Sequence, residues 1–248
     1  MPDDPIPAAT LVIFRDRPDA PPELLMVERA KAMAFAGGAM VFPGGRIDPG
    51  DHILAQASGA GEDGAARIAA IRETLEEAGL AIGLSPQPSP AQVVAIRARL
   101  HAGEGLAAIL ADERLAIDPD VLVPFARWLP AHAHMRIFDT LFFLVTAPDE
   151  AVATVDRTEN VRLIWTGAAE LLAQADAGHV TIIYPTRRNL ERLALYADYD
   201  DAVADARAYP VRTITPFTED RDGVAHLCIP DDLGYPITAE PMSAAMRG

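Results

Sequence analysis

The feature that most restricts the fold is a short apolar run followed by a glycine turn and an acidic helix. Residues 39–42 predict a strand that ends at Pro43-Gly44-Gly45, because proline and glycine stop strand pairing. Helical spacing then extends from an N-cap at Asp63 to a C-terminal glycine at Gly79. Residues three and four positions apart lie on one helix face. One face of this helix therefore carries three carboxylates, those of Glu73, Glu76 and Glu77.

This carboxylate cluster predicts a metal site. Like charges at these spacings cost a helix about 0.2–0.5 kcal/mol per pair, and a merely soluble helix would interleave lysine. Carboxylate oxygens grouped within one turn are hard ligands that suit Mg²⁺ or Mn²⁺. Arg72 adjoins the cluster and can orient a carboxylate through a bidentate contact. The alternative interpretation is an acidic helix face that is only solvated.

The turn and the helix together resemble the Nudix box. In that motif Gly, five residues, Glu and seven residues precede Arg-Glu-U-x-Glu-Glu-x-Gly-U, where U is aliphatic; residues 72–80 read Arg-Glu-Thr-Leu-Glu-Glu-Ala-Gly-Leu. Two departures stand out. Asp51 replaces the first Glu, and 20 residues rather than seven separate it from Arg72, an excess of 13. Thr74 also replaces an aliphatic residue, a change of similar volume.

The flanking sequence is similar to one branch of this superfamily, the coenzyme A diphosphatases. Residues 25–30 and 35–45 resemble the segment before the box in these enzymes, with Ala34 where many carry Arg. Trp128 followed by residues 136–143 is similar to the peroxisomal acyl-CoA diphosphatase branch, whose Nudix box is also split. The resemblance extends in patches from about residue 8 to residue 200.

The resemblance implies a Mg²⁺-dependent (or Mn²⁺-dependent) diphosphatase that hydrolyses CoA or acyl-CoA to 3′,5′-ADP and a 4′-phosphopantetheine product. Glu76 and Glu77 are the expected main metal ligands, with Glu73 as a further ligand or the general base and with the Gly44 carbonyl. The other expected site residues are Arg72 and Glu159 for catalysis and Arg29, Arg46 and Gly45 for substrate binding. Two alternatives remain: a diphosphatase for NADH or an ADP-sugar, and a non-catalytic Nudix-fold ligand sensor.

Three further features stand outside the motif. Asp139 inside an apolar strand is expected to pair with Arg136 or a backbone donor. His132 and His134 are expected in a loop rather than a zinc site. The basic pair Arg187-Arg188 at a helix start is a weaker candidate for contacting the 3′-phosphate of a CoA.

Composition excludes several classes of protein. A net charge of −15 argues against a nucleic-acid surface, and a lone Cys228 excludes a disulfide framework. The longest apolar run, residues 141–145, is far shorter than the roughly 20 residues of a membrane helix. We expect no signal peptide from residues 1–5, which are acidic and proline-rich, and no peroxisomal address from residues 246–248. We therefore expect a soluble cytoplasmic protein that binds a small nucleoside diphosphate derivative. A homodimer is compatible with this expectation.

The expected fold class is α/β, a Nudix-type α/β/α sandwich with a mixed sheet, in one domain spanning residues 1–248. A loop is expected at 46–61, a helical insertion at about 85–130, and a β-rich C-terminal tail with a turn at 219–223. The other expected strands are 9–14, 24–27, 137–145, 161–165, 211–214 and 226–229, and the other expected helices are 89–100, 167–173, 186–196 and 201–208.

Overall fold

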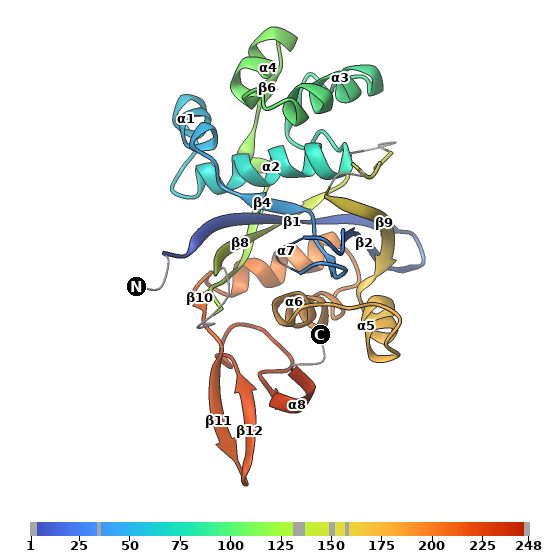
Figure 1. Ribbon diagram of the computed structural model, residues 1–248, viewed down its shortest axis with the longest axis vertical. Helices are drawn as coiled ribbons and strands as arrows, with labels where there is room; N and C mark the ends of the chain where they lie inside the picture. Colours follow the sequence, from blue (N-terminus) through green and yellow to red (C-terminus); the bar gives the residue numbers. More distant parts are fainter. Residues whose placement is uncertain (1–3, 34–35, 131–136, 149–151, 157–158, 246–248) are drawn as a thin grey trace.

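A mixed β-sheet forms the centre of the molecule (Figure 1). The computed structural model describes residues 4–33, 36–130, 137–148, 152–156 and 159–245. Within these ranges the sheet has the order β10-β7-β8-β1-β2-β3, with β4 beside β1 and β9 beside β2. Its strands are β1 (Ile6–Arg17), β2 (Ala20–Arg29), β3 (Met40–Val41), β4 (Gly44–Arg46), β7 (Val123–Trp128), β8 (Phe138–Thr146), β9 (Asn160–Gly167) and β10 (Thr213–Ile214).

Strand β1 shows why the sheet lies at the centre. It runs parallel to β8 and antiparallel to β2, so both of its edges are paired. Leu11 and Ile13 pack on one face of the sheet, whereas Val12 and Phe14 pack on the other. A strand buried on both faces reads as a continuous apolar run, as residues 9–14 do. Helices must therefore cover both faces.

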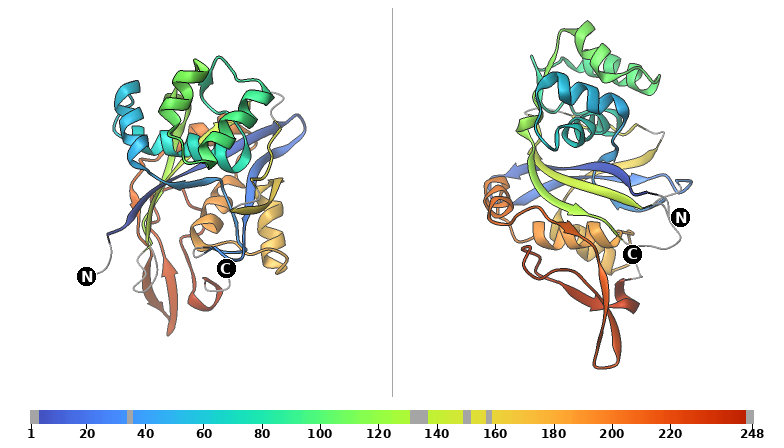
Figure 2. Two further views of the ribbon diagram at one scale, coloured as in Figure 1. Left: turned by 45° about the horizontal axis from the view of Figure 1, so that its top comes forward. Right: turned by 90° about the vertical axis from the view of Figure 1, so that its left-hand side faces the viewer.

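The acidic helix lies in the layer above the sheet, as Figures 1 and 2 show. Helix α2 (Gly64–Ala78) packs Ile71 and Ala78 against the sheet. Its opposite side packs Ile68 and Leu75 against further helices. Burying one such aliphatic side chain stabilises a fold by about 1.5–3 kcal/mol. The covering helices are α1 (Pro49–Ser58), α3 (Pro90–His101) and α4 (Leu106–Glu113), and short elements β5 (Leu84–Ser85), β6 (Ala116–Ile117) and η1 (Pro119–Val121) connect this layer to β7.

The layer below the sheet holds three helices and the C-terminal tail. Its elements are α5 (Ala168–Asp176), α6 (Tyr184–Leu193), α7 (Tyr199–Ala208), β11 (Phe217–Arg221), β12 (Val224–Cys228), β13 (Ala239–Pro241) and α8 (Met242–Ala245). Strands β11, β12 and β13 form a separate sheet that projects from the body (Figure 2). The expected α/β/α arrangement with a mixed sheet is confirmed.

Three local expectations are wrong. The expected loop at 46–61 contains helix α1, which begins where Asp51 accepts a hydrogen bond from the Asp48 backbone N–H (2.8 Å), a capping-box arrangement. Residues 123–128 are strand β7 rather than part of a helical insertion, with Pro124 at an irregularity of the pairing with β8. Glu219–Arg221 belong to β11, and only Asp222 and Gly223, both with positive φ, form the turn.

The helices are short or polar. Over the ranges that the structure describes, none is long and apolar enough to cross a membrane. The assignment of residues 1–248 to one domain stays a prediction.

Candidate active site

Two glutamates of α2, Glu73 and Glu77, contact the glycine turn at the start of β4, and Glu76 lies beside them on the same helix face, in contact with Arg72. Their side chains are largely buried, with exposed fractions of 18% for Glu73, 23% for Glu76 and 6% for Glu77. The Gly44 N–H donates a hydrogen bond to a Glu77 carboxylate oxygen at 3.0 Å. The turn and the end of the helix, far apart in sequence, therefore share one site.

Close approach restricts both glycines. A Cβ on Gly44 would stand 2.4 Å from the Ala9 carbonyl oxygen of the neighbouring strand, so this position has no room for a side chain. A Cβ on Gly45 would stand 2.3 Å from Cδ of Glu73 and 2.4 Å from one of its carboxylate oxygens. A side chain at position 45 would therefore displace the Glu73 carboxylate.

Arg72 holds the carboxylates in place from the side of α1. Its guanidinium donates to Asp51 through Nε (3.0 Å) and Nη2 (2.8 Å), and Nη2 also donates to the Arg46 carbonyl oxygen (2.9 Å). Nη1 donates to Glu73 at 2.9 Å and to Glu76 at 3.2 Å. Burial acts to lower the pKa of Arg72, but hydrogen bonds and charges of Asp51 and Glu73 outweigh it and raise that pKa.

Asp51 therefore occupies the position that the motif predicts, despite the longer sequence between the two halves. The additional residues fold as α1, which packs against α2 and returns Asp51, only 2% exposed, to Arg72. The sequence left a role for Asp51 open, and the structure shows it orienting Arg72. The signal that was available is the Asp48-Pro49-Gly50-Asp51 capping pattern.

A second group of polar residues faces the glutamates from the strands. Arg29 at the end of β2 lies opposite Asn160 at the start of β9. Its guanidinium is 4.0 Å from a Glu77 oxygen and 3.7 Å from a Glu159 oxygen. Asn160 is completely buried beside Glu77, and within the described structure neither its amide oxygen nor Arg29 Nε has a hydrogen-bond partner. A buried polar atom without a partner costs about 1–3 kcal/mol, so this corner is built to meet a polar ligand.

Burial changes the acidity of two glutamates. It raises the pKa of Glu77 to about 8. The neighbouring Asn160 amide acts to lower this pKa, and the charge of Glu73 raises it further. Burial raises the pKa of Glu73 to about 7, although the charge of Arg72 acts in the opposite direction. The site thus has too little positive charge for its carboxylates. A bound cation would stabilise their ionised forms.

The donor set fits a divalent cation of the Mg²⁺ type, because it consists of carboxylate oxygens on one helix face. Across the described ranges, no group of three acidic, histidine or cysteine side chains is already arranged to hold a metal ion. The reason is visible in the contacts: Glu73 and Glu76 are drawn to Arg72, and Glu77 is drawn to the Gly44 N–H. The role of the Gly44 carbonyl stays a prediction.

Residues that the sequence did not indicate hold the end of α2. Arg97 of α3 donates to the carbonyl oxygens of Glu76 (Nε, 2.6 Å) and Glu77 (Nη2, 2.8 Å), and to the Thr154 hydroxyl (Nη1, 2.9 Å). Asp156 accepts hydrogen bonds from the backbone N–H groups of Glu159 (2.7 Å) and Asn160 (3.1 Å). Arg97 and Asn160 lie in ordinary helix and strand patterns, so no sequence signal marks them.

Other expected residues lie elsewhere. Arg46 is exposed and contributes its carbonyl oxygen to Arg72. The weaker expectation that Arg187 and Arg188 offer a phosphate site is wrong. Arg187 pairs with Asp176 (2.8 Å), and buried Arg188 pairs with Glu191 (2.8 Å) and Glu240 (3.2 Å).

Asp139 is a structural residue, but its observed partner differs from the expected one. It accepts two hydrogen bonds from Arg127, at 2.8 and 2.6 Å, across the β7–β8 pair. Arg136, His132, His134 and Ala34 fall outside the described residues.

Comparison with known proteins agrees with the fold and the motif. No protein-family model matches the chain. "Putative nudix hydrolase 7" of Caenorhabditis elegans is 26% identical over 180 residues, which cover 71% of this chain and 57% of that protein. The chain thus spans little more than half the length of this curated relative. The crystal structure of a NUDIX hydrolase from Alicyclobacillus acidocaldarius superposes with a TM-score of 0.73 at 29% identity, covering 82% of this chain and 97% of that one.

In its layered fold, in the residues of its motif and in these likenesses, the chain is similar to the Nudix hydrolases.

Proposed function

We propose that this protein is a Mg²⁺-dependent hydrolase of the diphosphate bond in a nucleoside diphosphate derivative. One observation carries the proposal: Glu73 and Glu77, both little exposed, contact the glycine turn at Gly44 and Gly45, with Glu76 beside them on the same helix face. Near them the buried Arg29 Nε and the Asn160 amide oxygen lack partners among the described residues. Such a corner suits a cation and phosphate oxygens together.

Each residue of the site has a proposed role. Glu76 and Glu77 would hold Mg²⁺ (or Mn²⁺) together with Glu73 and the Gly44 carbonyl. When bound, the ion neutralises phosphate oxygens and lowers the pKa of water. Arg72 orients Glu73 and Glu76, and Arg29 would balance charge on the phosphate. Glu73 or Glu159 accepts the proton of the attacking water.

The substrate class that we propose is CoA or acyl-CoA, cleaved to 3′,5′-ADP and a 4′-phosphopantetheine product. Support comes from the split box, with its two halves joined through Asp51 and Arg72, and from the flanking segments similar to coenzyme A diphosphatases. NADH and ADP-sugars are the competing substrates. A ligand sensor is disfavoured because the chain retains all three helix glutamates. A cytoplasmic setting and a homodimer stay predictions.

A substrate panel tests the proposal. Purified protein is incubated with Mg²⁺ and with CoA, acetyl-CoA, NADH or ADP-ribose, and the products are separated by chromatography. We expect 3′,5′-ADP from the CoA substrates, and we expect Glu76→Gln to lower turnover by about a hundredfold or more. Glu62→Gln, which alters an exposed carboxylate before α2, is the matched control. Unchanged turnover in Glu76→Gln would refute the metal assignment. Turnover of ADP-ribose alone would refute the substrate class.

A further inference from the structure

A polar pocket of about 240 Å³ lies beside the end of β2. Cationic side chains from separate elements line it: Lys31 after β2, Arg162 of β9 and His179 after α5. Glu28 contributes a carboxylate, and Met40 and Thr181 also line the pocket. The pocket therefore joins β2, β3, β9 and the α5–α6 connection.

The pocket opens on the face of the sheet opposite to the glutamates. Along β9, Leu163 and Trp165 pack into the core beneath α2, whereas Ile164 packs into the core of the lower layer. Since side chains alternate along a strand, Arg162 shares the lower face with Ile164. Asn160 nevertheless points to the upper face, because the ladder shifts register between Glu28 and Arg29. Such bulges re-aim side chains next to functional sites.

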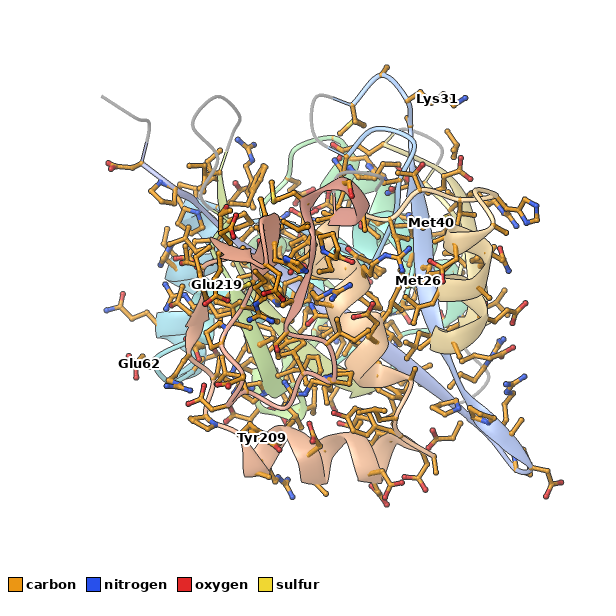
Figure 3. The ribbon with its side chains drawn as sticks, turned by 90° about the horizontal axis from the view of Figure 1, so that it is seen from below. Met26, Lys31, Met40, Glu62, Tyr209 and Glu219 are labelled. Carbon is orange, nitrogen blue, oxygen red and sulfur yellow. The ribbon has the colours of Figure 1, made fainter. Side chains whose placement is uncertain are left out.

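The lower layer holds the pocket in shape. The Met40 N–H donates to the Thr181 carbonyl oxygen at 2.8 Å, and Ala39 forms a bridge with Thr181. The segment before α6 is thereby fixed to β3. Figure 3 looks onto this face, where Met26, Met40 and Lys31 follow one another toward the end of β2. The walls are thus parts of the folded sheet.

The pocket brings together three exposed cationic side chains, those of Lys31, Arg162 and His179, in an acidic protein. The chain carries 36 acidic and 21 basic residues, and most of its buried or half-buried arginines are paired with carboxylates. In the part of the chain that the structure describes, Lys31, Arg162 and His179 form no ion pair or side-chain hydrogen bond. Donors left unpaired together in a polar pocket suit an anion, because lysine and arginine bind phosphate through charge-assisted hydrogen bonds.

We propose that this pocket binds a phosphate monoester carried by the same substrate whose diphosphate lies at the glutamates. This inference rests on the proposed function and narrows the substrate to nucleotides with an additional phosphate. Three segments of the chain contribute residues both to the pocket and to the glutamate site. The pocket residue Glu28 precedes Arg29, and the pocket residue Met40 precedes Gly44 by four residues. The pocket residue Arg162 follows Asn160 by two residues. An extended nucleotide passing around the end of β2 would reach both.

Isothermal titration calorimetry without Mg²⁺ tests the pocket directly. The probes are adenosine 3′,5′-bisphosphate and adenosine 5′-monophosphate, which differ by one phosphate. We expect the bisphosphate to bind roughly tenfold or more tightly, as charge-assisted hydrogen bonds to one phosphate allow. Arg162→Ala and Lys31→Ala should each reduce this ratio strongly while leaving the affinity for the monophosphate nearly unchanged. Arg207→Ala, which removes an equal charge from the exposed face of α7, should leave the ratio unchanged.

Several results would overturn the proposal. The first two are equal affinities for the two probes and no binding of the bisphosphate. The others concern the ratio of the two affinities: Arg162→Ala leaves this ratio unchanged, or Arg207→Ala reduces it as much as Arg162→Ala does. Failure of the proposed function looks different: no diphosphate would be hydrolysed with Mg²⁺, yet discrimination between the two probes would persist and depend on Arg162.

Discussion

Two groups of buried charges lie on opposite faces of the sheet, and they differ in how many of their charges have oppositely charged partners. At the end of α2, Arg72 serves Asp51, Glu73 and Glu76, while Glu77 has only the Gly44 N–H and a distant Arg29. In α6, Arg192 is 2% exposed and donates two hydrogen bonds to Asp205, at 2.9 and 2.6 Å.

The environment of Arg192 is closed by aromatic rings. Its guanidinium carbon lies 4.3 Å from the ring centre of Phe125, 5.3 Å from that of Tyr235 and 5.4 Å from that of Tyr209. Such cation–π contacts add to the ion pair when water is excluded. The comparison indicates that a buried charge with a full set of partners stabilises the fold. Buried carboxylates that outnumber the cations around them indicate a ligand-binding site. The predictions below test this contrast.

The largest effect is expected from Glu77→Gln. The change keeps the shape of the side chain but removes the charge that a divalent cation would bind, so turnover should fall by about a hundredfold or more. Because the carboxylate is buried with incomplete compensation, the thermal midpoint should not fall. Turnover and thermal unfolding are measured on the same preparation. A large loss of stability with retained turnover would show that Glu77 stabilises the fold and does not serve the reaction.

Arg192→Ala should have the opposite signature. It leaves Asp205 without its partner and opens space among Phe125, Tyr209 and Tyr235, so we expect a loss of about 3 kcal/mol in unfolding free energy. The turnover per folded molecule should stay unchanged. Urea unfolding provides the measurement. Arg212→Ala breaks the exposed pair with Asp232 and, as the control, should change the unfolding free energy far less than Arg192→Ala does.

Arg97→Ala tests whether the insertion supports the site. Removing its hydrogen bonds to the carbonyl oxygens of Glu76 and Glu77 loosens the end of α2, and we expect turnover to fall about tenfold. The Mg²⁺ concentration for half-maximal activity should rise, since the ligands are less well positioned. Arg97→Lys retains a donor and should recover part of both effects. A variant that loses only stability, with metal dependence unchanged, would assign Arg97 to packing alone.

The smallest effect concerns the pH dependence of stability at α6. Burial raises the pKa of Glu191 to about 7, although the charge of Arg188 acts to lower it. The folded-state pKa lies above the ordinary value, so the protonated form is favoured in the fold. This contribution is complete below about pH 4.5 and is lost as the pH rises through 7. Unfolding free energies of wild type and Glu191→Gln between pH 5 and 8 should therefore diverge, with the wild type losing more as pH rises. Parallel pH curves would contradict this prediction.

Part of this molecule was predictable from local patterns. Spacing placed Glu73, Glu76 and Glu77 on one helix face, and Ser89-Pro90 correctly indicated the start of α3, where Ser89 accepts a hydrogen bond from the Gln92 N–H. Strands such as 137–145 were visible as apolar runs. Strand β7 was not, because Pro124 interrupts the apolar run, and only pairing with β8 and β10 shows that the run is a strand.

What the sequence by itself determined is the acidic face of α2 and the glycine turn before it, because helix period and backbone freedom are properties of neighbouring residues. Tertiary structure alone decided the partners of that face. Packing of α1 on α2 returned Asp51 to Arg72, and the β2–β9 ladder set Arg29 and Asn160 against Glu77. Packing also buried Arg188 and left Arg162 unpaired beside a pocket. Such contacts join residues far apart in the chain, so they depend on how whole layers pack and not on any local pattern.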